Sequence, residues 1–337
     1  MKNLAKCYDE YHKKLLFIPI GILALSIIYL TFFYIQTGDI MNKDISLTGG
    51  ISITFETTIS QEQFQNTISQ QFQNFEIKQI SDNTGNQIKL AITTTEENNE
   101  KLKTIIEEQV GHKLTSENSS IEMTSSSLSD DFYKQLLIAI ILAFFWMSAV
   151  VFVIFSHGKK NKFYIVALNI FLGFFLGKIF FVINQVLATI IFIAFVATVV
   201  TIYIKNSIPS FAIIIAAFAN IIMTLSVVNL VGIKISTAGI IAFLMLIGYS
   251  VDTDILLTTR LLRGNKKTNE ALFSALKTGM MMTSTSLIAI ITALIVIYPF
   301  GSILNQVFTI LTIGLSFDIL NTWITNASII KMHLERK

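Results

Sequence analysis

The sequence predicts a polytopic α-helical membrane protein with about eight spans and one folded α+β domain outside the membrane. Hydrophobic residues make up 53% of the chain and charged residues only 14%, whereas soluble domains have roughly 25% charged residues. Apolar runs long enough to cross a bilayer recur along the chain. One polar stretch, residues 37–132, separates the first run from the others.

The first span is expected at residues 15–36, after a basic N-terminal segment of residues 1–14. A basic start before an apolar run is also typical of a secretory signal peptide. This run is long for the apolar core of such a peptide, and no small-x-small cleavage site follows it. The lysines of residues 1–14 are expected to hold the N-terminus in the cytoplasm, so that the chain emerges outside after Thr37.

The polar stretch 37–132 shows the periodicities of a folded α+β domain. Strands are expected at Gly50–Glu56, Glu76–Ile80, Gln87–Thr93 and Ser120–Thr124, and helices at Gln61–Phe72 and Glu96–Val110. The order β-α-β-β-α-β is that of a ferredoxin-like domain. The polar residues Ser125–Ser129 are expected to form a linker back to the membrane.

Residues 133–331 are predicted to form a bundle of about seven further spans, followed by a cytoplasmic tail at 332–337. The spans are expected at Tyr133–Phe155, Phe163–Ile183, Gln185–Ile204, Pro209–Leu230, Ile235–Leu257, Met280–Tyr298 and Ile303–Ile330. The basic clusters between them fall on the side of the N-terminus, which supports the count, and Lys234 is the exception.

Several polar residues within these spans need partners. Lys178 is expected either to snorkel towards the outside or to pair with a carboxylate such as Asp318, and snorkelling is preferred. Four asparagines are expected to form interhelical hydrogen bonds. They are Asn169, Asn184, Asn220 and Asn229.

Ionisable residues inside a span indicate a functional site, because a charge in hydrocarbon costs at least about 2.5–3.5 kcal/mol. Asp252, Asp254 and Arg260 follow the apolar run that begins at Gly239. On a helix, Asp252 and Asp254 point to roughly opposite sides, so one carboxylate is expected to face the bundle interior and the other a second helix or water. Alternatively, Asp254 and Arg260 lie past the membrane edge, where Arg260 snorkels.

The segments Gly248–Asp252 and Gly314–Asp318 share the pattern G-x-S-x-D. The repetition is either a coincidence of composition or a pair of small-residue patches that let two helices approach closely. In the second case, Asp252 and Asp318 meet at one polar centre, and Arg260 stabilises the ionised form of a carboxylate. Hydroxyl residues of an intervening span join them there: Thr283, Ser284, Thr285 and Ser286.

Six stretches, in this order along the chain, resemble one family. They are Leu47-Thr48-Gly49-Gly50, AFFWMSAVVFVIF, IPSFAIIIAAFANI, LMLIGYSVDTDILLTTRLLRG, ALKTGM and DILNTWITNASII. The series is similar to SecF of the archaeal type, and the segment GYSVDTDILLTTR, which includes Gly248, Tyr249 and Ser250, is specific.

The resemblance implies a membrane bundle of the resistance-nodulation-division (RND) type in the cytoplasmic membrane. It also implies a SecD partner, the Sec channel and unfolded exported polypeptide as partners besides membrane lipid, and export driven by the proton gradient rather than by a nucleotide.

The resemblance assigns Arg260 to the family's arginine, whereas Asn220 and Ser46 stand where the family usually has acidic residues. An amide does not titrate near neutral pH, so proton coupling through residue 220 is in doubt. The candidates for a proton relay are then Asp252, Asp254, Asp318 and Arg260, or a carboxylate of the SecD partner. Residues 155–206 are interpreted as a two-helix insertion that turns the family's six spans into about eight.

Two other functional classes use similar residues. A stand-alone proton-driven RND-type transporter of small molecules or lipids would normally have two repeated halves, and this chain is one half. Intramembrane aspartyl proteases use two aspartates that share a proton, but their G-x-G-D sequence is absent. No phosphate loop, metal-spaced His or Cys cluster or Ser-His-Asp set occurs, so we expect no enzyme, cofactor, metal or nucleic-acid partner.

Overall fold

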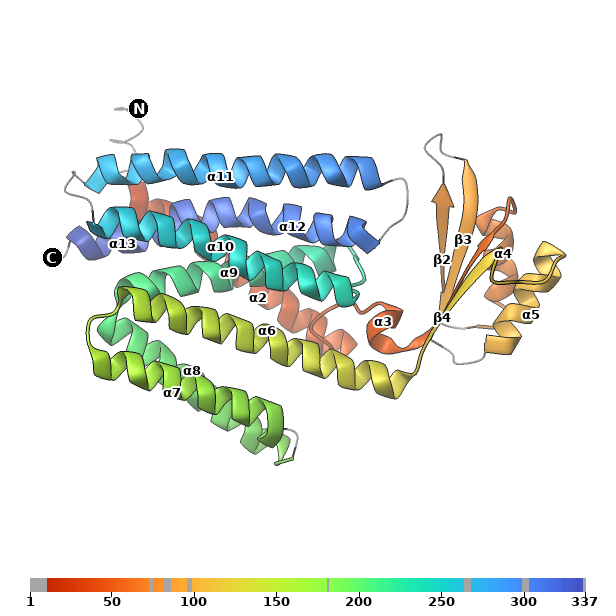
Figure 1. Cartoon of the computed structure of the whole chain (residues 1–337), viewed down its shortest axis with the longest axis horizontal. Helices are drawn as coiled ribbons and strands as arrows, with labels where there is room; N and C mark the ends of the chain where they lie inside the picture. Colours follow the sequence, from red (N-terminus) through yellow and green to blue (C-terminus); the bar gives the residue numbers. More distant parts are fainter. Residues whose placement is uncertain are drawn as a thin grey trace.

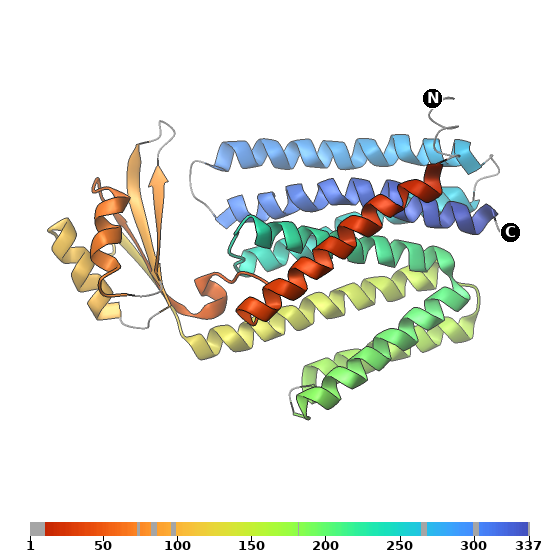
Figure 2. The same ribbon diagram turned by 180° about the vertical axis from the view of Figure 1, so that it is seen from behind.

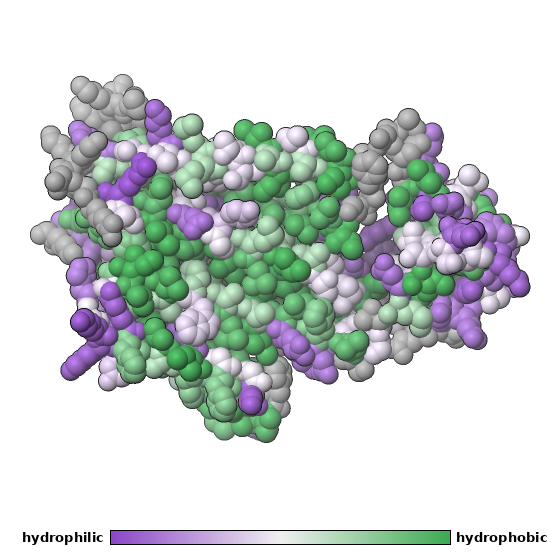
Figure 3. All heavy atoms as spheres, viewed as in Figure 1, coloured by the Kyte–Doolittle hydropathy of each residue, from purple (hydrophilic) through white to green (hydrophobic). Residues whose placement is uncertain are grey.

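A computed structural model describes residues 11–72, 75–81, 86–95, 99–180, 182–263, 268–298 and 303–335. A bundle of long helices forms one end of the molecule and a small α/β domain the other (Figure 1). Helix α2 begins and helix α13 ends at the end of the bundle remote from that domain, which we call the terminal end (Figure 2). Apolar side chains cover the bundle between its two ends, as the membrane assignment requires (Figure 3).

The small domain has the element order and sheet topology of a ferredoxin-like domain, as predicted. Its sheet has the strand order β2-β3-β1-β4 with antiparallel neighbours. The elements are β1 (Gly50–Glu56), α4 (Gln61–Ile68), β2 (Phe75–Ser81), β3 (Gln87–Thr94), α5 (Asn99–Val110) and β4 (Ser119–Thr124). Ile53 and Phe55 of β1 pack against Phe64 of α4 and Ile106 of α5. Helix α4 is shorter than expected, and the expected start of α5 at Glu96 lies outside the described residues.

Eight helices among the described residues are long and apolar enough to cross a membrane, which confirms the predicted number. They are α2 (Phe17–Thr37), α6 (Ser126–Phe155), α7 (Lys159–Phe174) with its π-helical extension η1 (Phe175–Ile179), α8 (Gln185–Asn206), α9 (Ile208–Leu230), α10 (Thr237–Arg263), α11 (Thr268–Ile297), and α12 (Ile303–Leu320) continued by η3 (Asn321–Asn326) and α13 (Ala327–Glu335).

The predicted linker at Ser125–Ser129 is wrong, because α6 already begins at Ser126. The side chain of Ser125 accepts a hydrogen bond from the backbone N–H of Leu128 and so caps this helix. A serine at this position satisfies one of the free N–H groups of the first turn. The polar sequence is therefore a helix start rather than a flexible connection.

Helix α9 lies at the centre of the bundle and contacts α2, α10, α12 and η3. Its buried face is rich in alanine, which lets the neighbouring backbones come close. Helices α7 and α8 form a hairpin next to α6, on the side away from α10. The hairpin diverges from the bundle towards the turn that joins α7 to α8 (Figure 1). Lys178, in η1 near this turn, is exposed, as expected for a snorkelling lysine.

None of the four span asparagines bonds to another span within the described residues. Asn169 donates to the carbonyl of Ile165 in its own helix, and Asn184 caps α8 through the N–H of Val186. Asn229 bonds to the segment after α2, where it donates to the carbonyl of Ile40. The expectation of interhelical bonds is therefore wrong for all four. Backbone groups close in space take the hydrogen bonds of Asn169, Asn184 and Asn229, whereas the amide of Asn220 has no partner among the described residues.

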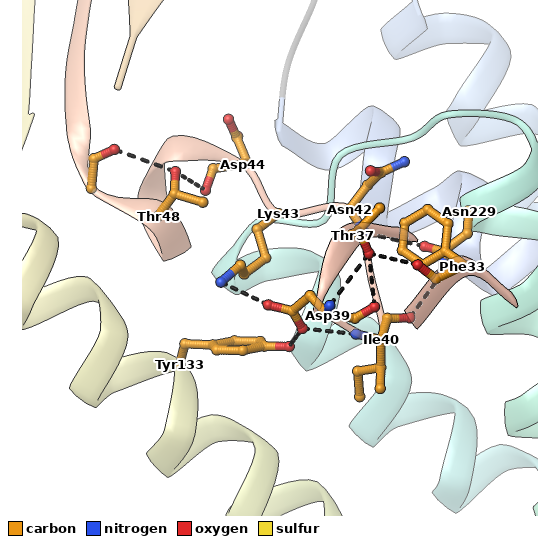
Figure 4. Close-up of polar contacts among 11 residues, drawn as sticks. Phe33, Thr37, Asp39, Ile40, Asn42, Lys43, Asp44, Thr48, Tyr133 and Asn229 are labelled. Atoms are coloured by element: carbon orange, nitrogen blue, oxygen red, sulfur yellow. Dashed lines mark hydrogen bonds and ion pairs between the residues drawn. The ribbon is translucent and has the colours of Figure 1, made fainter. Parts of the chain in front are cut away.

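A network of polar contacts joins the bundle to the segment that leads into the ferredoxin-like domain (Figure 4). Asp39 accepts a hydrogen bond from the Tyr133 hydroxyl at 2.5 Å and pairs with Lys43 at 2.8 Å. Lys43 and Ile235 form a parallel β-bridge, in which the N–H of Asp44 donates to the carbonyl of Ile235 at 2.9 Å. Helix α3 is Ile45–Thr48. The segment that connects α2 to α3 is therefore fixed against the loop between α9 and α10.

Candidate functional site

Two aspartates from different spans are buried next to each other in the bundle. Asp254 of α10 is 0% exposed, and Asp318 of α12 is 1% exposed. The two helices pack side by side, and the carboxyl groups are close enough to interact electrostatically. Buried carboxyl groups in a span are rare, because a charge there is expensive. This pair is therefore the main candidate for a functional site.

Polar side chains of the last span and of α10 surround the pair. Asn326 Nδ2 donates to Asp254 Oδ1 at 2.8 Å and lies 3.5 Å from Thr258 Oγ1. Thr322 Oγ1 lies 3.5 Å from Asp318 Oδ1, at the limit of a hydrogen bond. The π-helical segment η3 carries both of these residues, and π-helical segments are frequent at functional sites.

Several atoms of this cluster have no hydrogen-bond partner among the described residues. They are one carboxylate oxygen (Oδ2) of each aspartate, the Ser250 hydroxyl and Oδ1 of Asn326. Most buried polar atoms in proteins are paired. The unpaired acceptors can take up protons or accept hydrogen bonds from water.

Asp252 does not belong to this cluster. It is exposed on α10, whereas Asp254 faces the interior. The expected meeting of Asp252 with Asp318 is therefore wrong, and Asp254 takes its place. Asp254 is fully buried between helices. The alternative in which it lies past the membrane edge stays a prediction, because burial does not fix its depth along the membrane normal. The two positions are about 200° apart on a helix, so only one of them can face inward.

Arg260 points to helix α11 instead of the two aspartates. Its Nη1 atom donates to the carbonyl of Ser274 at 2.7 Å and to the hydroxyl of Thr278 at 2.9 Å. No ion pair joins it to an aspartate within the described part of the chain. In this arrangement Arg260 is not paired with a carboxylate, contrary to the prediction from the sequence. It instead fixes α10 against α11.

The hydroxyl residues of α11 make only a small contribution. Thr283 is buried, but Thr285 is exposed and bonds to the backbone carbonyls of its own helix. Ser284 and Ser286 are half-buried. The expected convergence of all four on one polar centre is therefore wrong.

The two G-x-S-x-D segments have different roles. A Cβ atom on Gly314 would lie 2.5 Å from Leu246 of α10, so this glycine does allow close packing. Nothing lies within 4 Å of the same position at Gly248, which faces outward beside Tyr249. Close helix approach thus applies to only one of the two segments.

The motif Leu47–Gly50 turns the chain from α3 into the sheet. Gly49 has φ +78° and Gly50 has φ +136°, values that L side chains rarely adopt. A Cβ atom on Gly50 would also collide with the carbonyl oxygen of Thr94. Ser46 accepts a hydrogen bond from the N–H of Thr237 at 3.3 Å, so the segment touches the start of α10.

Thr322 and Asn326 are not among the site residues predicted from the sequence. They follow Asp318 at intervals of four residues and thus lie on the same helix face. This spacing was visible in DILNTWITNAS, but the same segment also contains Asn321 and Thr325, and only packing shows which polar residues surround the carboxyl groups.

The fold and the buried acidic pair define a polytopic membrane protein with a helical bundle and one ferredoxin-like domain. The family model "Protein export membrane protein SecD/SecF, C-terminal" matches residues 173–336. Residues 173–336 of this chain are therefore similar to the C-terminal part of the SecD/SecF family.

Curated SecF proteins are similar to part of this chain. The protein-export membrane protein SecF of Methanocaldococcus jannaschii is 47% identical over 144 residues, which are 42% of this chain and 51% of that protein. SecF of Methanothermobacter thermautotrophicus is 42% identical over 158 residues, which are 45% of this chain and 55% of that protein. The chain spans about half the length of the curated relatives it matches.

One solved structure has the same fold. SecDF, a translocon-associated membrane protein from Thermus thermophilus, superposes with a TM-score of 0.59 at 13% sequence identity. The match covers 97% of this chain and 38% of that chain.

Proposed function

We propose that this chain is a SecF-like subunit that assists protein translocation across the cytoplasmic membrane, together with a SecD-like partner beside the Sec channel. The similarity of residues 173–336 to the SecD/SecF family model, together with the similarity to curated SecF proteins, supports the proposal. The solved SecDF chain is more than twice as long as the part that this chain matches, which fits a protein that needs a second half. The unfolded exported polypeptide and membrane lipid are the further partners that we propose.

The exposed face of α10 supports the proposal that a SecD-like partner binds within the membrane. Ile241, Met245, Tyr249 and Asp252 follow one another on this face, and all are exposed. Asp252 lies near the middle of the span, and no described group of the chain pairs with it. A carboxyl group that faces lipid is costly, so a partner with a polar or basic group opposite Asp252 would remove this cost.

We propose that the buried pair Asp254 and Asp318 relays protons. Two charges side by side in an apolar interior are unfavourable, so one carboxyl group holds a proton when the other is ionised. Asn326 stabilises the charge on Asp254 through its amide hydrogen. A change in the packing of α10 against α12 would then alter the proton occupancy of the pair, and this couples the bundle to the proton gradient.

The proposed orientation has both termini in the cytoplasm and the ferredoxin-like domain outside. The single cysteine of the sequence, Cys7, provides a direct test. A membrane-impermeant maleimide should label the exposed position of a Glu62→Cys variant, made in a Cys7→Ser background, in intact cells. The native Cys7 should react only after the membrane is opened, and the reverse pattern would contradict the orientation.

The first experiment is affinity purification of the chain from its native membrane in mild detergent, with mass spectrometry of the proteins recovered. We expect a SecD-like protein and components of the Sec channel. An Asp252→Arg variant should lose the SecD-like protein, whereas Asp254→Asn should retain it. Recovery of the chain alone as a stable homo-oligomer would instead favour a stand-alone RND-type transporter.

A further inference from the structure

A cavity of about 490 Å³ lies between helices α6, α8 and α9. Fifteen side chains line it, and all except Ser148 and Tyr203 are isoleucine, valine or phenylalanine. The two hydroxyl groups bond to each other at 2.9 Å. The cavity therefore offers a ligand an apolar surface without a free polar group.

The cavity is closed near the terminal end and opens to the side. At the closed end the Tyr203 ring packs against Phe152, with ring centroids 4.6 Å apart. Two lining residues, Val200 of α8 and Phe218 of α9, are each 39% exposed. All three helices are membrane spans by length and composition, so the opening faces hydrocarbon rather than water.

The size of the cavity restricts what can fill it. An α-helix is about 10 Å wide and rises about 5.4 Å per turn, so this volume holds only about one helical turn. A spanning helix of a partner does not fit. A single hydrocarbon chain does fit, and an apolar cavity left empty would lose the dispersion contacts of its lining.

The charge at the neighbouring helix ends indicates the headgroup. Lys159, Lys160 and Lys162 lie in the first turn of α7, and Lys205 lies in the last turn of α8. A hydrogen bond of 2.6 Å between Asn161 and Asn206 holds these two ends together. The sequence has no acidic residue between Asp131 and Asp252, so no carboxylate of the hairpin or of α9 neutralises these lysines. Clusters of lysines next to spans attract anionic lipid headgroups.

We propose that this cavity binds one hydrocarbon chain of an anionic membrane lipid, whose headgroup lies at the lysines of the α7–α8 hairpin. The bound lipid would fill the space where the hairpin diverges from α6 and α9 and would hold the hairpin against the bundle. The proposal does not depend on the proposed role in protein export.

The test is a titration of the purified, delipidated full-length chain with phosphatidylglycerol, followed by native mass spectrometry. Val196→Trp and Ile214→Trp each place a larger ring in the cavity, from α8 and α9 respectively. Ile193→Trp is the matched control, because Ile193 lies on α8 but is 62% exposed and does not line the cavity. Elution on gel filtration and helix content show whether each variant is folded.

We expect the wild type and Ile193→Trp to bind one lipid with the same affinity, and the cavity variants to bind it at least about tenfold more weakly. We also expect the wild type to bind phosphatidylcholine more weakly than phosphatidylglycerol. A variant with all four lysines changed to glutamine should bind phosphatidylglycerol more weakly than the wild type does. If the wild type binds no lipid, or if a folded cavity variant binds as well as Ile193→Trp, the cavity is not the site. Equal binding of phosphatidylcholine would overturn the assignment to an anionic lipid.

Discussion

Lys234 Nζ lies 2.5 Å from Glu76 Oε2, and this ion pair joins the loop between α9 and α10 to strand β2 of the ferredoxin-like domain. Lys234 is the basic residue that did not fit the positive-inside pattern of the sequence. Its pairing with a carboxylate of the domain explains why a lysine is present on that side. Gln306 of α12 donates a hydrogen bond to the backbone carbonyl of Lys234, and this bond fixes the loop.

Replacing Lys234 with methionine should loosen the ferredoxin-like domain on the bundle without unfolding either part. The lysine side chain is 45% exposed and the glutamate side chain 28% exposed, so we expect a loss of only about 0.2–1 kcal/mol. Distances between spin labels on the domain and on α9 should show a broader distribution. The matched control is Lys89→Met, which removes an ion pair within the domain and should leave the distribution unchanged.

The contact between domain and bundle should depend on pH. Burial raises the pKa of Glu76, but the hydrogen bond from Lys234 and the charges of Lys78 and Lys234 lower it more, so the pKa lies below its usual value of 4.5. A lowered pKa means that the ion pair stabilises the contact fully above about pH 4.5 and is lost as the pH falls through the lowered value. The spin-label distribution should thus broaden in acid, and this change should be absent in Glu76→Gln.

An Asp318→Asn variant should lose the dependence of export on the proton gradient. An amide keeps the size of the side chain but does not titrate near neutral pH. Export by membrane vesicles should fall to the rate measured when the gradient is collapsed, and Asp254→Asn should behave in the same way. Asp130→Asn, at an exposed position of α6, is the control. Unchanged gradient dependence in both buried variants would remove the pair from the mechanism.

Gly279→Ala should destabilise the bundle by about 1–3 kcal/mol, as overpacking of a core does. A Cβ atom at this position of α11 would collide with the ring of Trp323, and a rigid indole ring cannot move aside easily. The midpoint of thermal unfolding in detergent is the measurement. Gly248→Ala adds a methyl group where nothing lies within 4 Å and should leave the midpoint unchanged or slightly higher.

Much of the fold was predictable because its signals are local. Strand β1 was expected and found at Gly50–Glu56, since alternation of apolar and polar residues reports directly on a half-buried strand. The span that continues as η3 and α13 was less predictable. Its change to π-helical geometry at Asn321 depends on packing against α9 and α10, which no local pattern contains.

The sequence by itself determined the number of spans, the position of the folded domain and the presence of three aspartates within spans. Each of these depends only on the hydropathy and type of residues that are neighbours in the sequence. Only the tertiary structure decided that Asp254, and not Asp252, meets Asp318. The two aspartates lie two positions apart on one helix, and the rotation of α10 about its axis is set by its packing against α9 and α12. That packing is a property of several spans together, so the sequence of α10 alone left both choices open.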